Sequence, residues 1–339
     1  MQMKLLEVLG CPKCRGELAL GASVERDAEG NVETGELSCA RCAVSYPIRS
    51  GIPRFIGDDN YASSFGYQWN RFRLEQLDSA NGTHLSHKRF YSETEWPKEW
   101  MAGKWILDAG CGAGRFLDVA AQTGAQVVGM DISSAIEASR DNLKGNPNAH
   151  FVQASIYEMP FRDGVFDGVY CIGVIQHTPD PLKSVRALPR VLRAGGRIAY
   201  SMYEKRKYTL FHSKYILRPL TKKMGQKTLL QTIRAAMPVL FPLSEVAFRV
   251  PVAKRFLQFA IPIANYVGEP ELNVRQRYAW SLMDTFDMLA PQYDQPQTEP
   301  DVTAAMQSAG ITDIRRTPIK GLALVGRKVS SNGTKPTGE

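Results

Sequence analysis

The residue types best suited to chemistry lie on either side of a glycine-rich turn. Asp108 ends an apolar run and is followed by three glycines on alternate positions, Gly110, Gly112 and Gly114. Glycine tolerates positive φ and lets backbone N–H groups approach a ligand closely. The next apolar run ends in Asp131, whose carboxylate can accept hydrogen bonds from both hydroxyls of a ribose. We therefore expect a strand-to-helix turn that binds a ribose-bearing ligand.

The spacing of the glycines distinguishes two kinds of nucleotide site. A dinucleotide-binding turn has the pattern G-x-G-x-x-G, with an acid about twenty residues further on. This chain has G-x-G-x-G instead, with the carboxylate of Asp108 at the end of the preceding strand. A pyrophosphate gains nothing from a neighbouring carboxylate, whereas a ligand with an ammonium or sulfonium group does. The segment Leu107–Arg115 resembles the first motif of class I S-adenosylmethionine (SAM)-dependent methyltransferases.

The family's other landmarks follow in order along the chain. The resemblance covers residues 100–203 and 298–328, and it implies an α/β fold with a Rossmann-like core of seven strands. The expected elements are a third strand at 151–156, a fourth strand with its loop at 166–181, a helix at 184–192 that ends at Gly195–Gly196, a fifth strand at 197–203, and a closing strand pair at 310–314 and 321–326.

The resemblance also implies which residues bind the cofactor. The residues expected to hold SAM are Asp108, Gly110, Gly112, Gly114, Asp131, Ile132, Ser155, Ile156 and Cys171. Many relatives have Asp where this chain has Ser155, to accept from the adenine amino group, and a serine hydroxyl is a weaker acceptor. Judged by residue type, Cys111 and Cys171 are expected to be small, buried packing residues and not nucleophiles.

A general base has two candidate positions. Methyl transfer from a sulfonium is an in-line displacement, and holding the reacting atoms in line supplies most of the acceleration. A base is needed only where the acceptor carries a proton that must leave early. His177, in the loop after the fourth strand, stands where such a catalytic base would be; the alternative is that it orders the loop. Tyr203, at the end of the fifth strand, is a second pocket-facing candidate.

Four of the six cysteines form a metal-ligand pattern. Cys11 and Cys14 make one C-x2-C knuckle, and Cys39 and Cys42 make a second, with 24 residues between the two. Two knuckles can bring four thiolates to one tetrahedral zinc ion, and a site filled by protein ligands is structural. Two disulfides are the alternative. No segment resembles a secretion signal, so we expect a cytoplasmic protein with reduced thiols.

The sequence around these cysteines resembles the small zinc-ribbon proteins that activate tRNA and rRNA methyltransferases. The likeness rests on Lys4–Cys14, Leu37–Cys42 and Tyr46–Phe55. The same region is similar to the N-terminal ribbon of bacterial large-subunit rRNA guanine-N1 methyltransferases. Such ribbons dock on a methyltransferase domain, either as a scaffold or as a contact to RNA.

The chain divides into five expected segments. These are a zinc ribbon at 1–57, a linker and cofactor lid at 58–103, the methyltransferase core at 104–203 and 298–328, a helical insertion at 204–297 before the last strand pair, and a disordered tail at 329–339. Tyr67 and Trp69 are the candidates for the lid, with simple aromatic packing as the alternative. The longest uncharged apolar stretch near the middle, 256–267, is interrupted by Pro262 and is too short for a membrane span.

The insertion carries the basic character of the chain. Residues 205–257 contain 12 Lys and Arg and a single acid, Glu245, so their net charge is +11 while that of the whole chain is +8. Additions at this place in the family build the wall of the substrate pocket, so we expect Lys222, Lys223 and Lys227 to line an acceptor pocket. The positive charge could bind RNA phosphates, an anionic small molecule, or an acidic membrane surface that carries a lipid-linked substrate. A solvated helical face is the alternative to all three.

Three functions are open to such a chain. The first is methyl transfer to a nitrogen or oxygen of a small-molecule or lipid- or sugar-linked metabolite. The second is methylation of an rRNA or tRNA base, with the ribbon on RNA; no Asn/Asp-Pro-Pro-Tyr motif follows the fourth strand, where this chain has Gly173–Gln176. The third is a SAM-binding partner protein without catalysis, which the intact first motif disfavours. We expect the first, because no RNA-binding motif is visible and the charge is confined to the insertion.

Overall fold

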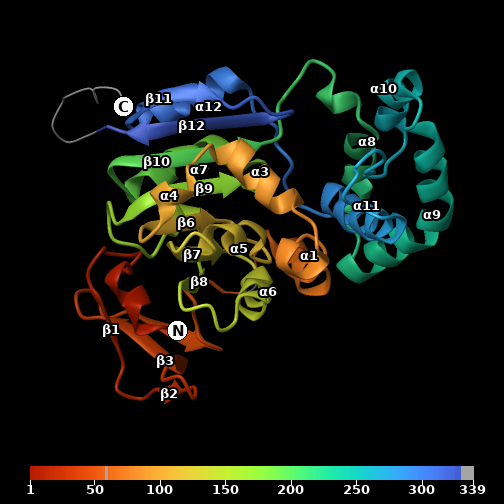
Figure 1. Ribbon diagram of the computed structural model, residues 1–339. Coiled ribbons are helices and arrows are strands. Elements are labelled where there is room, and N and C mark those ends of the chain that lie inside the picture. The colour runs from red at the N-terminus through yellow and green to blue at the C-terminus, as the bar shows by residue number, and fades with distance from the viewer. Residues whose placement is uncertain (58–59, 330–339) are drawn as a thin grey trace.

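The central sheet contains both parallel and antiparallel strands. In the computed structural model, which describes residues 1–57 and 60–329, seven strands lie in the order β11-β12-β10-β9-β6-β7-β8 (Figure 1). Their bounds are β6 Trp105–Ala109, β7 Gln126–Asp131, β8 Ala149–Gln153, β9 Phe166–Ile172, β10 Leu192–Met202, β11 Ile311–Arg316 and β12 Leu322–Lys328. The pairs from β8 to β10 are parallel, whereas β12 is antiparallel to β10 and β11. The predicted seven-stranded α/β core is confirmed.

Helices cover both faces of this sheet. The core helices are α3 Leu85–Thr94, α4 Lys98–Met101, α5 Arg115–Ala121, α6 Ala135–Asn142, α7 Pro181–Ala187 and α12 Glu299–Ser308. Ile106 and Tyr170 pack on the face covered by α3 and α5. The next residues along the same strands, Leu107 and Cys171, pack on the face covered by α7 and α12. Because these strands are buried on both faces, their sequences read as continuous apolar runs.

The order of the strands defines where a ligand can bind. From β6 the chain runs outward through β7 to β8 and then returns to place β9 on the other side of β6. In open parallel sheets the ligand crevice lies at the carboxyl ends of the strands beside such a switch point. The glycine-rich turn follows β6 directly, so the fold places it at this crevice.

The N-terminal ribbon is a small sheet that packs against the edge of the large one (Figure 1). Its strands are β1 Leu18–Leu20, β2 Glu25–Arg26, β3 Val32–Cys39, β4 Ser45–Arg49 and β5 Ile52–Pro53. The N–H of Phe55 donates to the carbonyl of Gln153 at the end of β8 (2.9 Å). Leu9 and Leu37 of the ribbon belong to the same apolar cluster as Val152 of β8. The ribbon and the core therefore share one hydrophobic core.

The insertion forms a separate block of helices on the opposite side of the molecule (Figure 1). Its helices are α8 Ser213–Thr221, α9 Gln226–Ala247, α10 Pro251–Ala260 and α11 Val274–Leu289. They enclose their own apolar cluster, which includes Met237 and Phe286 and also receives Phe72, next to the end of α1 (Ser63–Arg71). No helix among the described residues has the length and apolar character needed to cross a membrane.

Two details differ from the sequence expectation. Strand β10 starts at Leu192, and Gly195–Gly196 lies inside it, where the pairing with β9 shifts register. The expected break between helix and strand is therefore wrong: the glycine pair forms an irregularity within the strand, with φ +74 at Gly195. The preceding helix α7 ends earlier than expected, and Pro189 follows in a short 3-10 turn. The expected disordered tail lies outside the described residues apart from Val329.

Candidate functional site

The four knuckle cysteines converge in the ribbon. Their Sγ atoms all lie within 4.8 Å of one another, with Cys11 and Cys42 3.6 Å apart and Cys14 and Cys39 3.4 Å apart. Four sulfurs placed tetrahedrally at a Zn–S distance of about 2.3 Å are separated by about 3.8 Å. The cluster fits a structural zinc ion, because the protein supplies all four ligands.

The glycine-rich turn lies in close contact with neighbouring side chains. Gly110, Gly112 and Gly114 all have positive φ, at +88, +54 and +85. A Cβ on Gly112 would lie 3.2 Å from Nε1 of Trp69, and a Cβ on Gly110 would lie 2.5 Å from a methyl group of Val174. A larger residue at either position would be strained and would collide with these side chains.

Asp131, at the end of β7, is held in place by three donors. Its Oδ2 atom accepts from the N–H of Gly112 (3.0 Å), and its Oδ1 atom accepts from the N–H (2.8 Å) and the hydroxyl (2.7 Å) of Ser133. Burial raises the pKa of Asp131, and these donors act in the opposite direction. Because a carboxylate accepts in about four lone-pair directions, one direction on Oδ2 remains for a ligand hydroxyl. This geometry fits the ribose of SAM.

Asp108 lies beneath the same turn and is almost completely buried. Its Oδ2 atom makes no hydrogen bond of acceptable geometry within the described chain. Burial raises the pKa of Asp108 well above its usual range, although the neighbouring Tyr170 hydroxyl acts in the opposite direction. A buried acceptor without a partner is unfavourable unless a bound group compensates it. Because Asp108 does not line the cavity, a ligand above the turn would act on this carboxyl group through electrostatics and not through a direct hydrogen bond.

A cavity of about 480 Å³ opens at the carboxyl ends of the central strands. We call the part bordered by the glycine turn, Asp131, Ile132 and Ile156 the cofactor half. The remaining part, the acceptor half, is lined by Gln76, Arg89, His177, Tyr203, Tyr266, Trp280, Asp284 and Asp287. These residues come from the segment before the core, from loops of the sheet and from the insertion, so the cavity joins segments that are far apart in sequence.

The acceptor half contains charges of both signs in a hydrogen-bonded network. Asp284 accepts from the hydroxyl of Tyr266 and from the amide of Gln76 (3.4 Å). Burial, followed by the nearby charge of Asp287, raises the pKa of Asp284 to about 7. The guanidinium of Arg115 donates to the other amide atom, Oε1 of Gln76 (2.5 Å), and burial lowers its pKa to about 9. This half of the cavity suits a polar acceptor group.

His177 lines the acceptor half beside Tyr203, with the two rings 5.6 Å apart. Its Nδ1 atom lies 3.0 Å from the backbone carbonyl oxygen of Tyr293. A carbonyl oxygen can only accept, so Nδ1 carries the proton in this arrangement and Nε2 keeps its lone pair. Nε2 is therefore the ring atom that can take a proton.

Four of the expected cofactor residues do not line the cavity. Asp108 lies below the turn, Gly114 starts α5, and the hydroxyl of Ser155 accepts from a backbone N–H two residues later (3.2 Å). Cys171 points to the α7 face, and Ile172 lines the cavity instead, because successive residues of a strand point to opposite faces. The other five, Gly110, Gly112, Asp131, Ile132 and Ile156, are brought together.

The two lid candidates lie in different places. Trp69 lines the cavity directly over Gly112. Tyr67 instead packs toward the insertion, with its ring 5.9 Å from that of Phe286. No motif marks the charged lining residues Arg89 and Asp284, since each is a single residue on an ordinary helix and only tertiary packing brings them together.

The basic residues of the insertion do not line the acceptor half. The ionisable groups that the insertion contributes there are acids, including Asp284 and Asp287. Lys222 and Lys223 border a smaller pocket of about 340 Å³, and Lys227 is exposed on α9. The expectation that these three lysines line the acceptor pocket is therefore wrong. Net charge along a segment does not reveal which side of each helix packs inward.

Two family models match the chain. Residues 107–200 match the model of a methyltransferase domain, and residues 2–51 match the model of Trm112p-like protein. The chain is 32% identical over 132 residues to the ubiquinone biosynthesis O-methyltransferase of Pseudomonas fluorescens, covering 36% of this chain and 56% of the relative. It is 29% identical over 133 residues to the protein of that name from Acinetobacter baumannii, covering 36% and 55%. The chain thus spans about half the length of the curated relatives it matches.

One solved structure similar to the chain is the complex between the Haloferax volcanii Trm112 methyltransferase activator and a methyltransferase. The similarity covers 80% of this chain and 100% of that one, with a TM-score of 0.44 and 11% sequence identity.

Proposed function

We propose that this chain, a class I methyltransferase domain joined to a Trm112p-like zinc ribbon, transfers the methyl group of SAM to an oxygen or nitrogen of a small-molecule or lipid-linked acceptor. The main support for this proposal is that one continuous cavity contains both the cofactor half and the acceptor half. Its cofactor half contains Asp131 and the glycine turn, and the same cavity extends to His177, Tyr203 and Asp284.

The cofactor half would hold SAM by the groups already described. The remaining lone-pair direction on Oδ2 of Asp131 would accept from a ribose hydroxyl, and the glycine turn would leave room for the rest of the ligand. Trp69 would cover it from the α1 side. Bound SAM supplies an activated methyl group, and the protein's task is to align the acceptor atom with it and to exclude water.

The acceptor half favours a small molecule or one end of a longer molecule. Residues of α11 such as Trp280 and Asp284 lie over it, together with Gln76 from the segment before the core. An acceptor hydroxyl must lose its proton during transfer, and Nε2 of His177 would accept that proton. Asp287 also lines this half and interacts electrostatically with His177, so it would stabilise the imidazolium that forms. The curated relatives are named as O-methyltransferases, which favours an oxygen acceptor.

Methylation of an rRNA or tRNA base is a second candidate. The observation in its favour is the match of residues 2–51 to Trm112p-like protein, because the ribbons that the sequence resembles serve RNA-modifying methyltransferases. The ribbon packs on the β8 edge, and no ribbon residue within the described range 1–57 lines the acceptor half.

One experiment separates the two candidates. The full chain would be incubated with methyl-labelled SAM and, separately, with total RNA, with a small-metabolite extract and with a lipid extract from the source cells. We expect label in the metabolite or lipid fraction, with none from Asp131→Ala. Label confined to RNA would favour the second candidate, and SAM binding without label in any fraction would contradict both.

A further inference from the structure

Helix α8 packs with its polar side inward. It buries Lys214 and Arg218, while Ile216 and Leu220 are 73% and 68% exposed. The ammonium of Lys214 bonds to the buried carboxylate of Asp294 (2.8 Å). Arg218 donates to the backbone carbonyls of Met288, in the last turn of α11, and Pro291, just after that helix. A helix on the surface of a globular protein normally buries its apolar side and exposes its charged side to water. The outer, exposed side of α8 is therefore apolar.

The neighbouring helix α9 has two apolar stripes. The first, which includes Met237 and Phe241, faces the core of the insertion. The second consists of Val239, Leu243 and Val246, spaced four and three residues apart, and all three are more than half exposed. At 3.6 residues per turn the second stripe lies on the opposite side of the helix from the first. Nothing in the described chain covers it.

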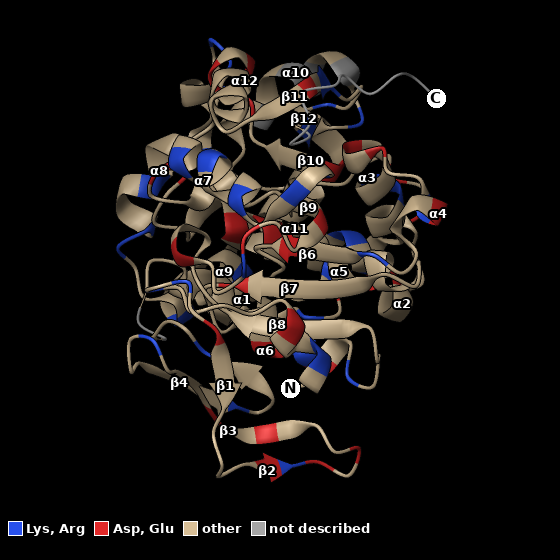
Figure 2. Cartoon of the chain, turned by 90° about the vertical axis from the view of Figure 1, so that its left-hand side faces the viewer, with Lys and Arg blue, Asp and Glu red and all other residues tan. Residues whose placement is uncertain are grey.

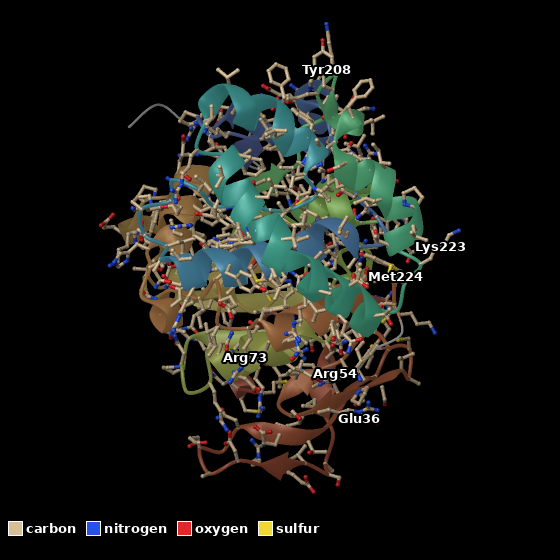
Figure 3. The ribbon with its side chains drawn as sticks, turned by 90° about the vertical axis from the view of Figure 1, so that its right-hand side faces the viewer. Glu36, Arg54, Arg73, Tyr208, Lys223 and Met224 are labelled. Carbon is tan, nitrogen blue, oxygen red and sulfur yellow. The ribbon has the colours of Figure 1, made fainter. Side chains whose placement is uncertain are left out.

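These features belong to one face, which we call the docking face: the outer sides of residues 205–256. Of the fifteen large apolar side chains that are exposed in the described chain, eleven lie between Tyr208 and Phe256, so they are concentrated and not scattered. The rings of His212 and Phe259, 5.8 Å apart, join the start of α8 to α10. Figure 3 views this helical block from outside, with Tyr208 projecting from its upper edge and Lys223 from its side.

Cations flank the apolar side chains of the docking face. Six exposed side chains have no ion-pair partner among the described residues: Lys205, Lys207, Lys222, Lys223, Lys227 and Arg234. The only acid in this stretch, Glu245, pairs with Arg277 (3.0 Å) and is nearly buried. Helix α8 itself contains no acid (Figure 2). The face is thus apolar and cationic with no free carboxylate on its described part.

We propose that the docking face binds the surface of a membrane that contains anionic lipids, with its apolar side chains entering the headgroup region. Helices that lie in the membrane plane combine an apolar side with flanking Lys and Arg, and each basic residue is attracted by the negative surface potential. RNA would match the cations but would leave exposed aliphatic residues such as Val239 and Leu243 without partners. A second copy of the same face would bring like charges together.

Docking would also bring the cavity close to the bilayer. Lys222 and Lys223 border the smaller pocket, and Tyr61 lines both this pocket and the main cavity. The two pockets therefore lie on either side of Tyr61, so docking would place the main cavity beside the membrane surface. Membrane binding itself does not rest on the proposed methyl transfer and can be measured without any acceptor.

The test is sedimentation of the full chain with vesicles of phosphatidylcholine, with and without phosphatidylserine. The wild-type chain should sediment with the anionic vesicles and be released as salt rises. Lys222→Glu/Lys223→Glu/Lys227→Glu should weaken this binding by about 100-fold, since each lysine near the surface contributes about fivefold. A matched control of equal charge change, Lys98→Glu/Lys144→Glu/Lys320→Glu, uses exposed lysines elsewhere and should leave binding unchanged.

The apolar part is tested by Ile216→Ser/Leu220→Ser/Val239→Ser, which should reduce binding, with Leu74→Ser (46% exposed in the wild type) as the control that should not. Calorimetric SAM binding checks that every variant is folded. Failure of the wild-type chain to bind anionic vesicles would overturn the proposal. So would loss of RNA binding or of self-association in these variants with vesicle binding unchanged. None of these outcomes bears on whether methyl transfer occurs.

Discussion

Replacing Asp131 by Ala should weaken SAM binding, and the hydrogen bonds that its carboxylate makes determine by how much. Three of about four lone-pair directions are used by Gly112 and Ser133, so the wild-type carboxylate can offer one direct bond to the ribose without rearrangement. A hydrogen bond to a charged group contributes about 1.5–3 kcal/mol, and about 1.4 kcal/mol corresponds to tenfold in affinity. We therefore expect the dissociation constant for SAM to rise by about 10- to 100-fold.

The same substitution should also lower stability. It leaves the N–H groups of Gly112 and Ser133 without their acceptor in a buried place, which costs about 1–3 kcal/mol for each group that stays unsatisfied. Ser133→Ala is the matched control, because it removes one donor to Oδ1 and leaves the Oδ2 side of Asp131 intact. SAM affinity should then change little. Isothermal titration with SAM, combined with thermal unfolding of each variant, measures both effects. A folded Asp131→Ala protein with wild-type SAM affinity would refute the assignment of this carboxylate.

Three further predictions follow from the site. His177→Gln should lower kcat by about 10²- to 10⁴-fold with SAM affinity unchanged, as expected for loss of a general base; an unchanged kcat would leave His177 only a role in ordering the loop. Elemental analysis should find one zinc per chain, and Cys14→Ser should release it. Cys14→Ser should also lower the melting temperature of the whole chain, because the ribbon shares its core with the large sheet. An unchanged melting temperature of the methyltransferase core would contradict this. The raised pKa of Asp284, about 7 against about 3.9 in an unfolded chain, means that the contribution of Asp284 to the free energy of unfolding is greatest below pH 4 and is lost as pH rises through 7. Asp284→Asn should flatten this dependence in urea unfolding measured across that range, and an identical slope would show that other groups cause it.

The sequence was informative where function depends on local geometry. The glycine spacing after Asp108 and the acid at Asp131 act through the backbone of one turn, so their types and order predicted the cofactor half. The two C-x2-C knuckles predicted the cysteine cluster for the same reason. His177 and Tyr203 of the acceptor half were expected from their places after two strands. The rest of this half could not be predicted, because Arg89, Tyr266 and Asp284 lie on separate segments with no motif and meet only after the insertion folds back over the sheet.

The insertion shows how composition can mislead. The charge count located the basic segment correctly. It could not show that Lys214 and Arg218 are buried, or that Ile216 and Leu220 are exposed. Ile216 and Leu220 lie four residues apart on this nine-residue helix, and such spacing of apolar residues normally predicts a buried stripe. Only the position of the partner carboxylate of Asp294 shows that α8 packs the other way.

The place of the ribbon gives a physical reason for its fusion to the methyltransferase domain. β8 is the last strand of the sheet on its side, and an uncovered edge strand exposes unpaired backbone groups. The ribbon covers it: Phe55 bonds to the backbone of Gln153, and the guanidinium of Arg54 bonds to the side chains of Gln153 (2.7 Å) and Glu137 (2.8 Å). The next residue after β8, Ala154, lines the cavity. Removing the metal should loosen the ribbon, and we expect the disturbance to pass through the end of β8 to the cofactor half of the cavity.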